Sequence, residues 1–242
     1  MSTRRTVSLF ATCLGDQLRA DAVEAAAAVL ERAGCAVQFD PRQTCCGQPA
    51  FNSGYWREAR AVARRFVDLF EHVEAVVVPS GSCTAMVHRL PQLFADDPDL
   101  LPRVRAVATK TFELSQFLVR ELGVTDLDAR LDARVAWHDA CHGLRELGVR
   151  GEPRALLAHV RGLELIETRT CEACCGFGGT FSIKLPEVST AMLDHKLDEL
   201  QAAGVDVVAS LDASCLMQID GRMRRRGIRV RTMHLAEILA AR

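Results

Sequence analysis

The sequence has no apolar run long enough to cross a membrane and no excess of charge of either sign. A bilayer-spanning helix needs about 20 mostly apolar residues, and the 242-residue chain contains no such segment. The formal net charge is -1, which gives no general attraction to nucleic acid or to an anionic membrane surface. We therefore expect neither a membrane span nor nucleic-acid binding.

Two further signals are missing. The residues from Met1 to Arg5 lead directly into the strand-like segment Val7–Ala11. This leaves no room for the apolar region and cleavage site of a signal peptide, so we expect a cytoplasmic protein. A Gly-x-Gly-x-x-Gly dinucleotide-binding turn is also missing, since Gly176-x-Gly178-Gly179 has the wrong spacing and follows cysteines. Any hydride acceptor is therefore expected on another protein.

Cysteine, in contrast, is abundant, with ten residues in the chain. Secreted disulfide scaffolds are usually short and rich in loops, whereas this chain is long and has helical periodicity. In a reducing compartment, clustered cysteines more often indicate metal binding or redox catalysis. The cysteine content therefore favours a metal or redox site over a disulfide framework.

The cysteines form two tandem copies of one pattern. Each copy has a single cysteine, then Cys-Cys-Gly, then another single cysteine, with nearly the same spacing in both. The ends of the copies also match, because Phe112–Leu118 resembles Met233–Leu239. We therefore predict two domains, residues 1–123 and 132–242, joined by the polar linker Val124–Leu131.

Each copy alternates short apolar runs with amphipathic segments, which is typical of an α/β fold with parallel strands. The expected strands are Val7–Ala11, Val37–Phe39, Ala75–Val78, Arg134–Trp137, Leu163–Ile166, Val205–Ala209 and Ile228–Arg231. The expected helices are Ala22–Arg32, Trp56–Phe70, Arg154–Val160, Val188–Ala202, Leu216–Arg225 and Leu235–Ala241. The predicted fold class is α/β, a tandem duplication of a Rossmann-like parallel-sheet module.

The repeated cysteines all follow a predicted strand or lie in the loop after one. Because the loops at the carboxyl ends of parallel strands converge, the four cysteines of each copy can meet at one rim. Neighbouring residues of a strand face opposite ways, so a loop around a metal explains the Cys-Cys pairs better than an apolar core does. The predicted cofactor and metal ligands are Cys13, Cys45, Cys46, Cys83, Cys141, Cys174, Cys175 and Cys215. Cys35, at the start of a predicted strand, is expected in the core.

Four thiolates per copy suit either a [4Fe–4S] cluster or a tetrahedral zinc site. Structural zinc sites usually pair their ligands as Cys-x₂₋₄-Cys, and neither copy has this arrangement at all four positions. Iron–sulfur clusters are therefore favoured, with zinc in a structural or assembly module as the alternative. A third possibility is a thiol–disulfide oxidoreductase that reacts through Cys45-Cys46 or Cys174-Cys175.

Other residues near the second Cys-Cys pair allow two interpretations each. Cys171 is either an extra thiolate ligand or a spare loop cysteine. His138, Asp139 and His142 could ligate iron, tune a potential or move a proton, or they could cap a helix. The basic run Arg222–Arg231 has no interleaved aromatic residues, which favours a solvated helix face over a docking surface for an acidic partner.

These motifs resemble a known family. The Cys…Cys-Cys-Gly…Cys repeat resembles the CCG cysteine-rich domain found in heterodisulfide reductases and in the iron–sulfur component of glycolate oxidases. The resemblance to the lactate utilisation protein A (LutA/YkgE) family is closer and extends from about Val7 to Leu239. It rests on the segments Thr12–Asp16, Gln43–Gly54, Pro79–Cys83, His138–His142, Cys174–Phe181 and Cys215–Gln218.

The resemblance implies an iron–sulfur electron-transfer component of a multi-subunit system that oxidises L-lactate to pyruvate. It implies two partner proteins, including a ferredoxin-type iron–sulfur subunit, and leaves the organic chemistry to a partner. The chain would then be a subunit of an oxidoreductase complex rather than a self-sufficient enzyme. Heterodisulfide reductase modules end in Cys-x-x-Cys, but here Met86 and Gln218 stand at the last positions. This departure argues against the noncubane cluster and direct disulfide reduction of those enzymes.

Overall fold

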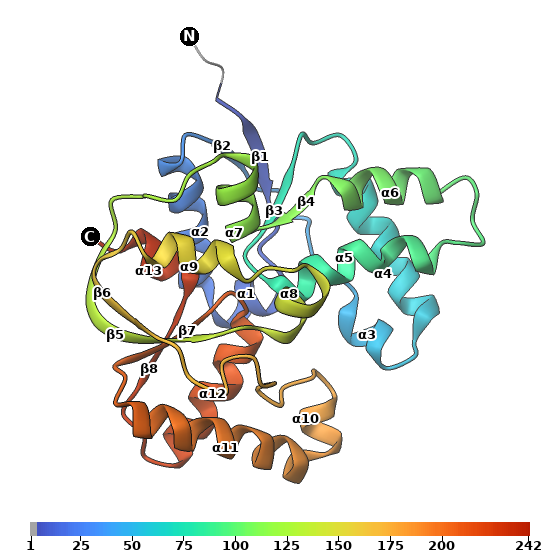
Figure 1. Cartoon of the computed structure of the whole chain (residues 1–242). Helices are drawn as coiled ribbons and strands as arrows, with labels where there is room; N and C mark the ends of the chain where they lie inside the picture. Colours follow the sequence, from blue (N-terminus) through green and yellow to red (C-terminus); the bar gives the residue numbers. More distant parts are fainter. Residues whose placement is uncertain (1–3) are drawn as a thin grey trace.

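The computed structural model describes residues 4–242 and contains two parallel β-sheets of four strands each (Figure 1). The first sheet has the order β2-β1-β3-β4 and the second the order β6-β5-β7-β8. The strands of the first sheet are β1 (Thr6–Leu9), β2 (Ala36–Gln38), β3 (Val76–Val78) and β4 (Thr111–Glu113). Those of the second are β5 (Arg130–His138), β6 (Arg161–Ile166), β7 (Val207–Ser210) and β8 (Arg231–His234). The expectation about a signal peptide rests in part on residues 1–3, which lie outside the described residues.

Helices connect the strands of both sheets. Those of the first half are α1 (Cys13–Leu18), α2 (Ala20–Arg32), α3 (Gln48–Asn52), α4 (Trp56–Phe70), α5 (Gly81–Leu93), α6 (Leu101–Thr109) and α7 (Leu114–Gln116), which continues into the π-helical turn η1 (Phe117–Glu121). Those of the second half are α8 (Cys141–Glu146), α9 (Gly151–Leu157), α10 (Phe181–Lys184), α11 (Pro186–Ala203), α12 (Ala213–Arg225) and α13 (Leu235–Ala240). None of the helices in residues 4–242 combines the length and the apolar character that a membrane crossing requires.

The two halves repeat one topology, which confirms the predicted α/β duplication. Strands β1, β2, β3 and β4 correspond in order and in pairing to β5, β6, β7 and β8. The sequence similarity between the ends of the two halves has a structural counterpart. Strands β4 and β8 each lead into a helix whose first turn is closed by a capping box. Glu113 forms this box with Gln116, and His234 forms it with Glu237.

One predicted strand was wrong, and several elements of both halves were missed. The chain leaves α12 through Gly227, whose φ is 68°, and the Ile228 amide donates to Met223 O at 3.0 Å. After the turn at Arg226 and Gly227, residues 228–230 have no regular structure, and the strand expected at Ile228–Arg231 begins only at Arg231. Strand β4 and helices α1, α3, α7, α8 and α10 are too short to show periodicity, and the longer helices α5 and α6 were not predicted either.

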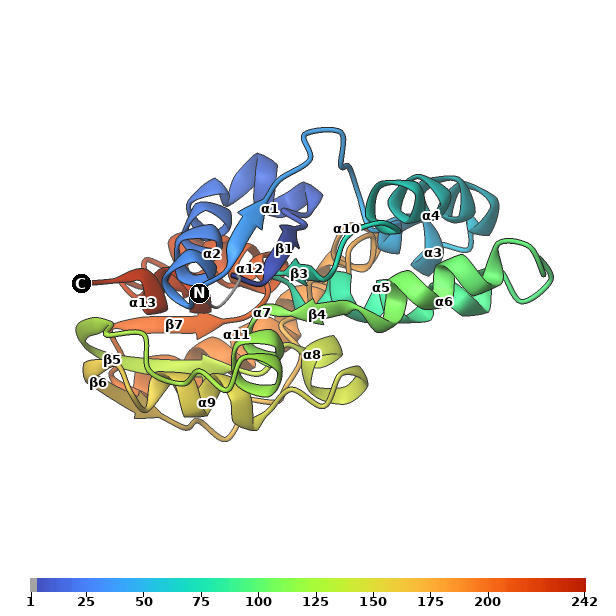
Figure 2. The ribbon, with the colours of Figure 1, turned by 90° about the horizontal axis from the view of Figure 1, so that it is seen from above.

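The halves pack reciprocally through equivalent elements. Helix α13 packs on α2, while its counterpart α7 with η1 packs on α9; likewise α5 packs on α8, and α12 contacts α1. At the centre, Ser80 and Asp212, which precede α5 and α12, form an antiparallel bridge. One hydrophobic core therefore extends through both halves. A second core lies between the first sheet and helices α4, α5 and α6, which project to one side in Figure 2.

Glu113 gives the stability a predictable dependence on pH. Its side chain is fully buried, and Oε2 accepts the amides of Ser115 and Gln116 at 2.8 and 3.2 Å. Burial raises the pKa of Glu113 from 4.5 to about 7, so the folded protein binds this proton more tightly than the unfolded chain. The stabilisation is present below the unfolded pKa and is lost as the pH rises through the folded pKa, by about 3 kcal/mol in total.

The measurement is urea unfolding of the parent and of Glu113→Gln at about pH 5 and about pH 8. Buried His138 and His234 have lowered pKa values and change the stability in the opposite direction, but they are common to both proteins. The difference between the two proteins therefore isolates Glu113, and we expect the parent to lose more stability with rising pH. Parallel profiles would show that Glu113 is already ionised in the folded protein.

Candidate metal centre

All eight repeated cysteines line a single cavity of about 230 Å³. The cavity lies between the halves, where the chain turns from strands of both sheets into the following helices. The sequence predicted one cysteine rim for each copy; in the structure the two rims open onto the same space. The cavity-lining cysteines are Cys13, Cys45, Cys46, Cys83, Cys141, Cys174, Cys175 and Cys215.

In the first half, the cysteines come together from three loops. Cys13 begins α1, Cys83 lies in the first turn of α5, and Cys45 and Cys46 precede α3. The Cys13 and Cys45 sulfurs are 3.6 Å apart, and those of Cys46 and Cys83 are 3.4 Å apart. The Ser80 side chain caps α5 by accepting from the Cys83 amide at 3.3 Å. Helix N-termini favour negative charge, which suits thiolates at these positions.

The second half repeats this construction. Cys141 begins α8, Cys174 and Cys175 precede α10, and Cys215 lies in the first turn of α12, whose cap is Asp212. Asp212 also ties the halves together, because its Oδ2 accepts from the Ser82 amide at 2.8 Å. The equivalent residues of the two halves therefore hold their sulfurs on equivalent elements.

A glycine turns the backbone after each Cys-Cys pair. Gly47 and Gly176 have φ values of 88° and 80°, which disfavour any residue with a Cβ. Their amides donate to the Cys45 and Cys174 sulfurs at 3.4 and 3.3 Å, respectively. Each glycine thus stabilises a thiolate on the residue two positions before it.

The thiols of each set cannot all ionise by themselves. Hydrogen bonds from Cys13 and Cys46 lower the pKa of Cys45 to about 2, and the same hydrogen bonds raise the pKa values of Cys13 and Cys46. In the second half, hydrogen bonds from Cys141 and Cys175 lower the pKa of Cys174 to about 2. A positively charged metal centre removes this conflict, because it binds thiolates and favours their ionisation. The donor chemistry therefore fits a thiolate-bound metal or iron–sulfur site.

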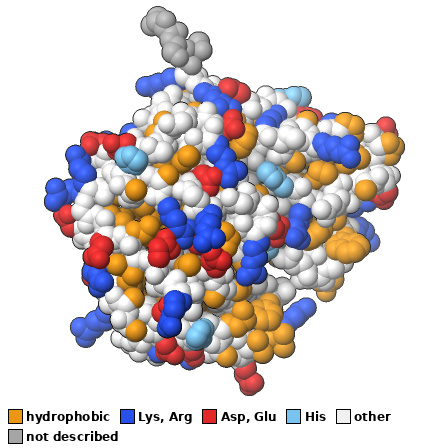
Figure 3. All heavy atoms as spheres, viewed as in Figure 1, with side chains coloured by type: hydrophobic (Ala, Val, Ile, Leu, Met, Phe, Trp, Pro, Cys, Tyr) orange, Lys and Arg blue, Asp and Glu red, His pale blue; other side chains and the backbone are white. Residues whose placement is uncertain are grey.

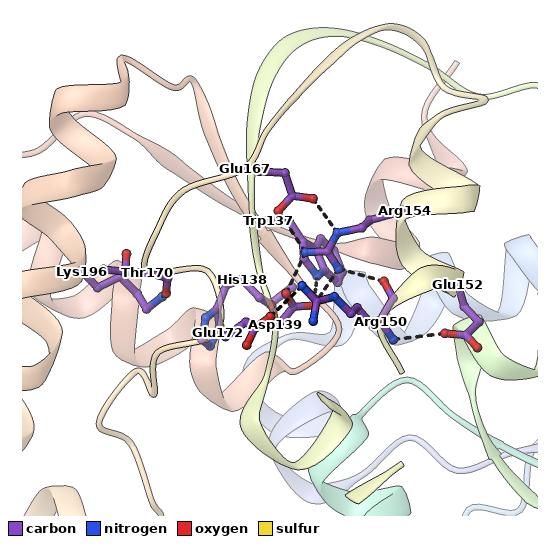
Figure 4. Close-up of polar contacts among 11 residues, drawn as sticks. Trp137, His138, Asp139, Arg150, Glu152, Arg154, Glu167, Thr170, Glu172 and Lys196 are labelled. Atoms are coloured by element: carbon purple, nitrogen blue, oxygen red, sulfur yellow. Dashed lines mark hydrogen bonds and ion pairs between the residues drawn. The ribbon is translucent and has the colours of Figure 1, made fainter. Parts of the chain in front are cut away.

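His138 and Lys196 add buried polar groups to the second set. Donor atoms of His138, Cys175 and Cys215 all lie within 4.8 Å of one another. Burial, and then the charge of Lys196, lower the pKa of His138 to about 4, so this imidazole is neutral. Lys196 is itself 2% exposed, and its Nζ donates to the Thr170 carbonyl. Figure 4 shows His138 between Lys196 and the Asp139–Arg154 pair.

Asp139 anchors the segment that carries His138. Its carboxylate is 1% exposed and accepts from Arg154 at 2.9 and 2.7 Å and from Trp137 Nε1 at 2.8 Å. Arg154 also pairs with the more exposed Glu167 (Figure 4). Of the interpretations open for Asp139, the structure gives it a positioning contact rather than a place at the cavity.

The remaining sequence candidates lie away from the cavity or at its rim. Cys171 has its donor atom within 4.8 Å of those of Asp139 and Glu172, and it is not a cavity-lining residue. His142 lines the cavity, and its Nδ1 lies 3.5 Å from the Cys141 sulfur. Cys35 is buried in the core, as predicted.

Three of the six arginines of the basic run form ion pairs within the second half. Arg222 and Arg226 both pair with Asp194, and Arg224 pairs with Asp220 on its own helix. These contacts agree with the predicted helix face, while Arg225, Arg229 and Arg231 form no ion pair within residues 4–242.

Two parallel sheets with four cysteines each at one shared cavity define a tandem cysteine-rich α/β protein. A family model described as a cysteine-rich domain, CCG, matches residues 7–88 and 135–220. A protein from Exiguobacterium sp. named Lactate utilization protein A is 46% identical over 235 residues, 96% of each chain. A protein of the same name from Bacillus subtilis is 45% identical over 236 residues, 98% of this chain and 99% of that one. The chain therefore belongs to the lactate utilization protein A family of CCG-domain proteins.

A crystal structure of a hypothetical protein from Helicobacter pylori has a similar fold. It aligns with a TM-score of 0.67 and 11% sequence identity, over 98% of this chain and 49% of that chain. At this identity the likeness concerns the fold alone.

Proposed function

We propose that the chain is the iron–sulfur electron-transfer component of a multi-protein system that oxidises L-lactate to pyruvate. The observation that carries the proposal is the meeting of eight cysteines, in two sets of four, at one cavity. The names of the relatives support lactate utilisation as the process. Each of the units 1–123 and 132–242 would hold one cluster at its own set of four cysteines.

The residues of the chain would hold, tune and shield the clusters. An iron–sulfur cluster supplies one-electron transfer when bound. The lowered pKa values of Cys45 and Cys174 favour their thiolate forms. The helix N-termini at Cys13 and Cys83 favour negative charge on the sulfurs of these two residues. The opening of both cysteine sets onto one cavity supports a relay between two neighbouring centres. The first set also lacks the compact geometry of a zinc site: among the described residues, no three of its sulfurs lie within 4.8 Å of one another.

Partner proteins would supply the lactate chemistry and accept the electrons. We assign two partners, one of them a ferredoxin-type iron–sulfur subunit, and a cytoplasmic location. An exposed apolar patch over α10 and the start of α11 supports protein contact at the cavity side (Figure 3). Its residues are Ile183, Leu185, Val188 and Met192. Thr180, which directly precedes α10, lines the cavity, and its Oγ1 lies 3.3 Å from Ser53 Oγ of the first half. The patch therefore lies beside the cavity opening, where the two halves meet.

The test is the iron, sulfide and zinc content of protein purified without oxygen, together with its visible spectrum. We expect about four irons and four sulfides per set, and an absorbance that bleaches on reduction. About one zinc per set after anaerobic reconstitution, without iron, would contradict the proposal and indicate a structural module. Protein with neither metal would point to thiol–disulfide chemistry.

A further inference from the structure

The two halves differ systematically behind their cysteines. Four positions of the first half can be matched to four positions of the second. Two pairs are matched by their spacing from equivalent cysteines, and two by their places on the helices α4 and α11, which follow the Cys-Cys-Gly turns. The backbone carbonyl of Ala59 lies nearest the Gly47 turn, and that of Ser189 lies nearest the Gly176 turn, which sets the register of α4 against α11. In the first half the four positions hold Phe10, Ala59, Phe66 and Met86, all buried and apolar. In the second half they hold His138, Ser189, Lys196 and Gln218.

The first half fills this space with packed rings. Phe10 and Phe66 meet edge to face with ring centroids 5.0 Å apart, and both belong to the core beside β1 and β3. Such a pair offers no donor atom to the cysteines. The first set therefore has only its four sulfurs as ligands from this side.

The second half replaces the ring pair by His138 and Lys196. His138 is 2% exposed, and within residues 4–242 neither its Nδ1 nor its Nε2 has a hydrogen-bond partner. A buried polar group without a partner destabilises a fold. The His138 imidazole therefore lowers the stability of the folded protein when no ligand or metal binds it. The sulfurs of Cys175 and Cys215 lie close to this imidazole, and both are ligands in the proposed function.

The other polar replacements are already engaged. Gln218 Nε2 donates to Ser189 Oγ at 2.8 Å, and that hydroxyl donates to the Gly176 carbonyl at 2.7 Å. Lys196 donates to Thr170 and holds a buried positive charge beside the second set. Of these four residues, His138 alone has nitrogens left over for the metal that the sulfurs would bind. Imidazole nitrogen is a common ligand of iron and of zinc.

We infer that His138 is a protein ligand of the metal centre in the second half, so that this centre has mixed sulfur and nitrogen ligation while the first has sulfur alone. The inference rests on the proposed function only for the identity of the metal. A [4Fe–4S] cluster takes four protein ligands, so His138 would take the place of one of the four thiolates of the second set. A neutral imidazole in place of a thiolate raises the potential of an iron–sulfur centre, and the Lys196 charge acts in the same direction. The second centre would thus be the better electron acceptor of the two.

The experiment is pulsed electron paramagnetic resonance on the reduced, iron-loaded protein, grown with ordinary or ¹⁵N-labelled histidine. We expect a strongly coupled nitrogen that responds to the label, and its complete loss in His138→Phe, which installs the residue found at the equivalent position of the first half. His142→Phe is the matched control, since His142 also lies beside a cysteine of this set, and it should keep the signal. Loss of the signal in His142→Phe, or its survival in His138→Phe, would overturn the assignment. Labelled parent protein provides the result even where a variant fails to fold: no histidine nitrogen at the centre would refute the inference.

X-ray absorption separates this inference from the proposed function. A nitrogen ligand at about 2.0–2.1 Å is resolved from sulfur at about 2.3 Å for a tetrahedral zinc site, and the measurement is made at the edge of whichever metal the protein holds. Zinc with one such nitrogen in the second site would contradict electron transfer but support the His138 ligand. Iron–sulfur clusters that show no histidine nitrogen would support electron transfer and refute the ligand.

Discussion

Cys45→Ser is expected to reduce the iron bound per chain to about half of the parent value. Cys45 lies within the first set, and the hydrogen bonds that it receives from Cys13 and Cys46 lower its pKa, which favours the thiolate that binds iron. A serine hydroxyl does not ionise near neutral pH, so it offers iron a much poorer ligand. The second set uses none of the same sulfurs and should remain loaded. Iron, sulfide and the visible spectrum measure the loss.

The structure supplies matched controls for this change. Cys174→Ser should produce an equal loss from the second set, and the double variant should bind almost no iron. Cys35→Ala removes a core cysteine that does not line the cavity and should leave the iron content unchanged. Full iron in Cys45→Ser would remove Cys45 from the ligand set. A complete loss of iron in the single variant would instead show that both sets hold one common centre.

Asp139→Ala is expected to lower the free energy of unfolding by about 3–5 kcal/mol, because it leaves a partly buried cation without its buried partner. The Asp139 carboxylate is 1% exposed and binds two nitrogens of Arg154 as well as Trp137 Nε1. The Trp137 indole is buried, so its N–H would lose its acceptor as well. The measurement is urea denaturation of metal-free protein, which keeps metal binding out of the comparison.

Glu167→Ala is the control for the ion pair. Glu167 binds the same Arg154, but its side chain is 46% exposed, so its removal should cost no more than about 1 kcal/mol. Equal destabilisation by Asp139→Ala and Glu167→Ala would show that burial of the carboxylate does not determine how much its ion pair with Arg154 contributes to stability.

The regular elements could be predicted where the local pattern was strong. Helix α4 was predicted with its observed bounds, Trp56–Phe70, because its apolar positions recur with helical spacing along its whole length. The duplication then fixed the sheet class, since two copies of one pattern have to form two copies of one topology. Strand β8 was misplaced because the apolar residues before it, Ile228 and Val230, pack against the core from an irregular segment and not from a strand. Its position is decided by pairing with β7, which is a long-range contact.

The cysteine positions were predictable, but the shared cavity was not. Each copy indicates its own rim, and nothing in either copy indicates that the rims face each other. That arrangement depends on contacts between the halves, such as the Ser80–Asp212 bridge and the packing of α13 on α2. Lys196 was missed for a related reason: a lysine on a surface helix is normally exposed, and only the tertiary structure shows that this one is buried. The sequence did contain a signal for Lys196. It lies seven residues after Ser189, just as the buried Phe66 lies seven residues after Ala59 at the corresponding positions of the first half.

The reciprocal packing of the halves has the form of an isologous dimer contained in one chain. In a dimer of identical subunits, every substitution at such an interface appears twice, once on each side of the symmetry axis. A cavity on that axis has two equivalent ends, and electrons in it have no preferred direction. Covalent fusion removes this constraint, because the two sides can then vary independently. His138 and Lys196 stand on one side only, so the cavity is polarised in a way that no pair of identical subunits can achieve.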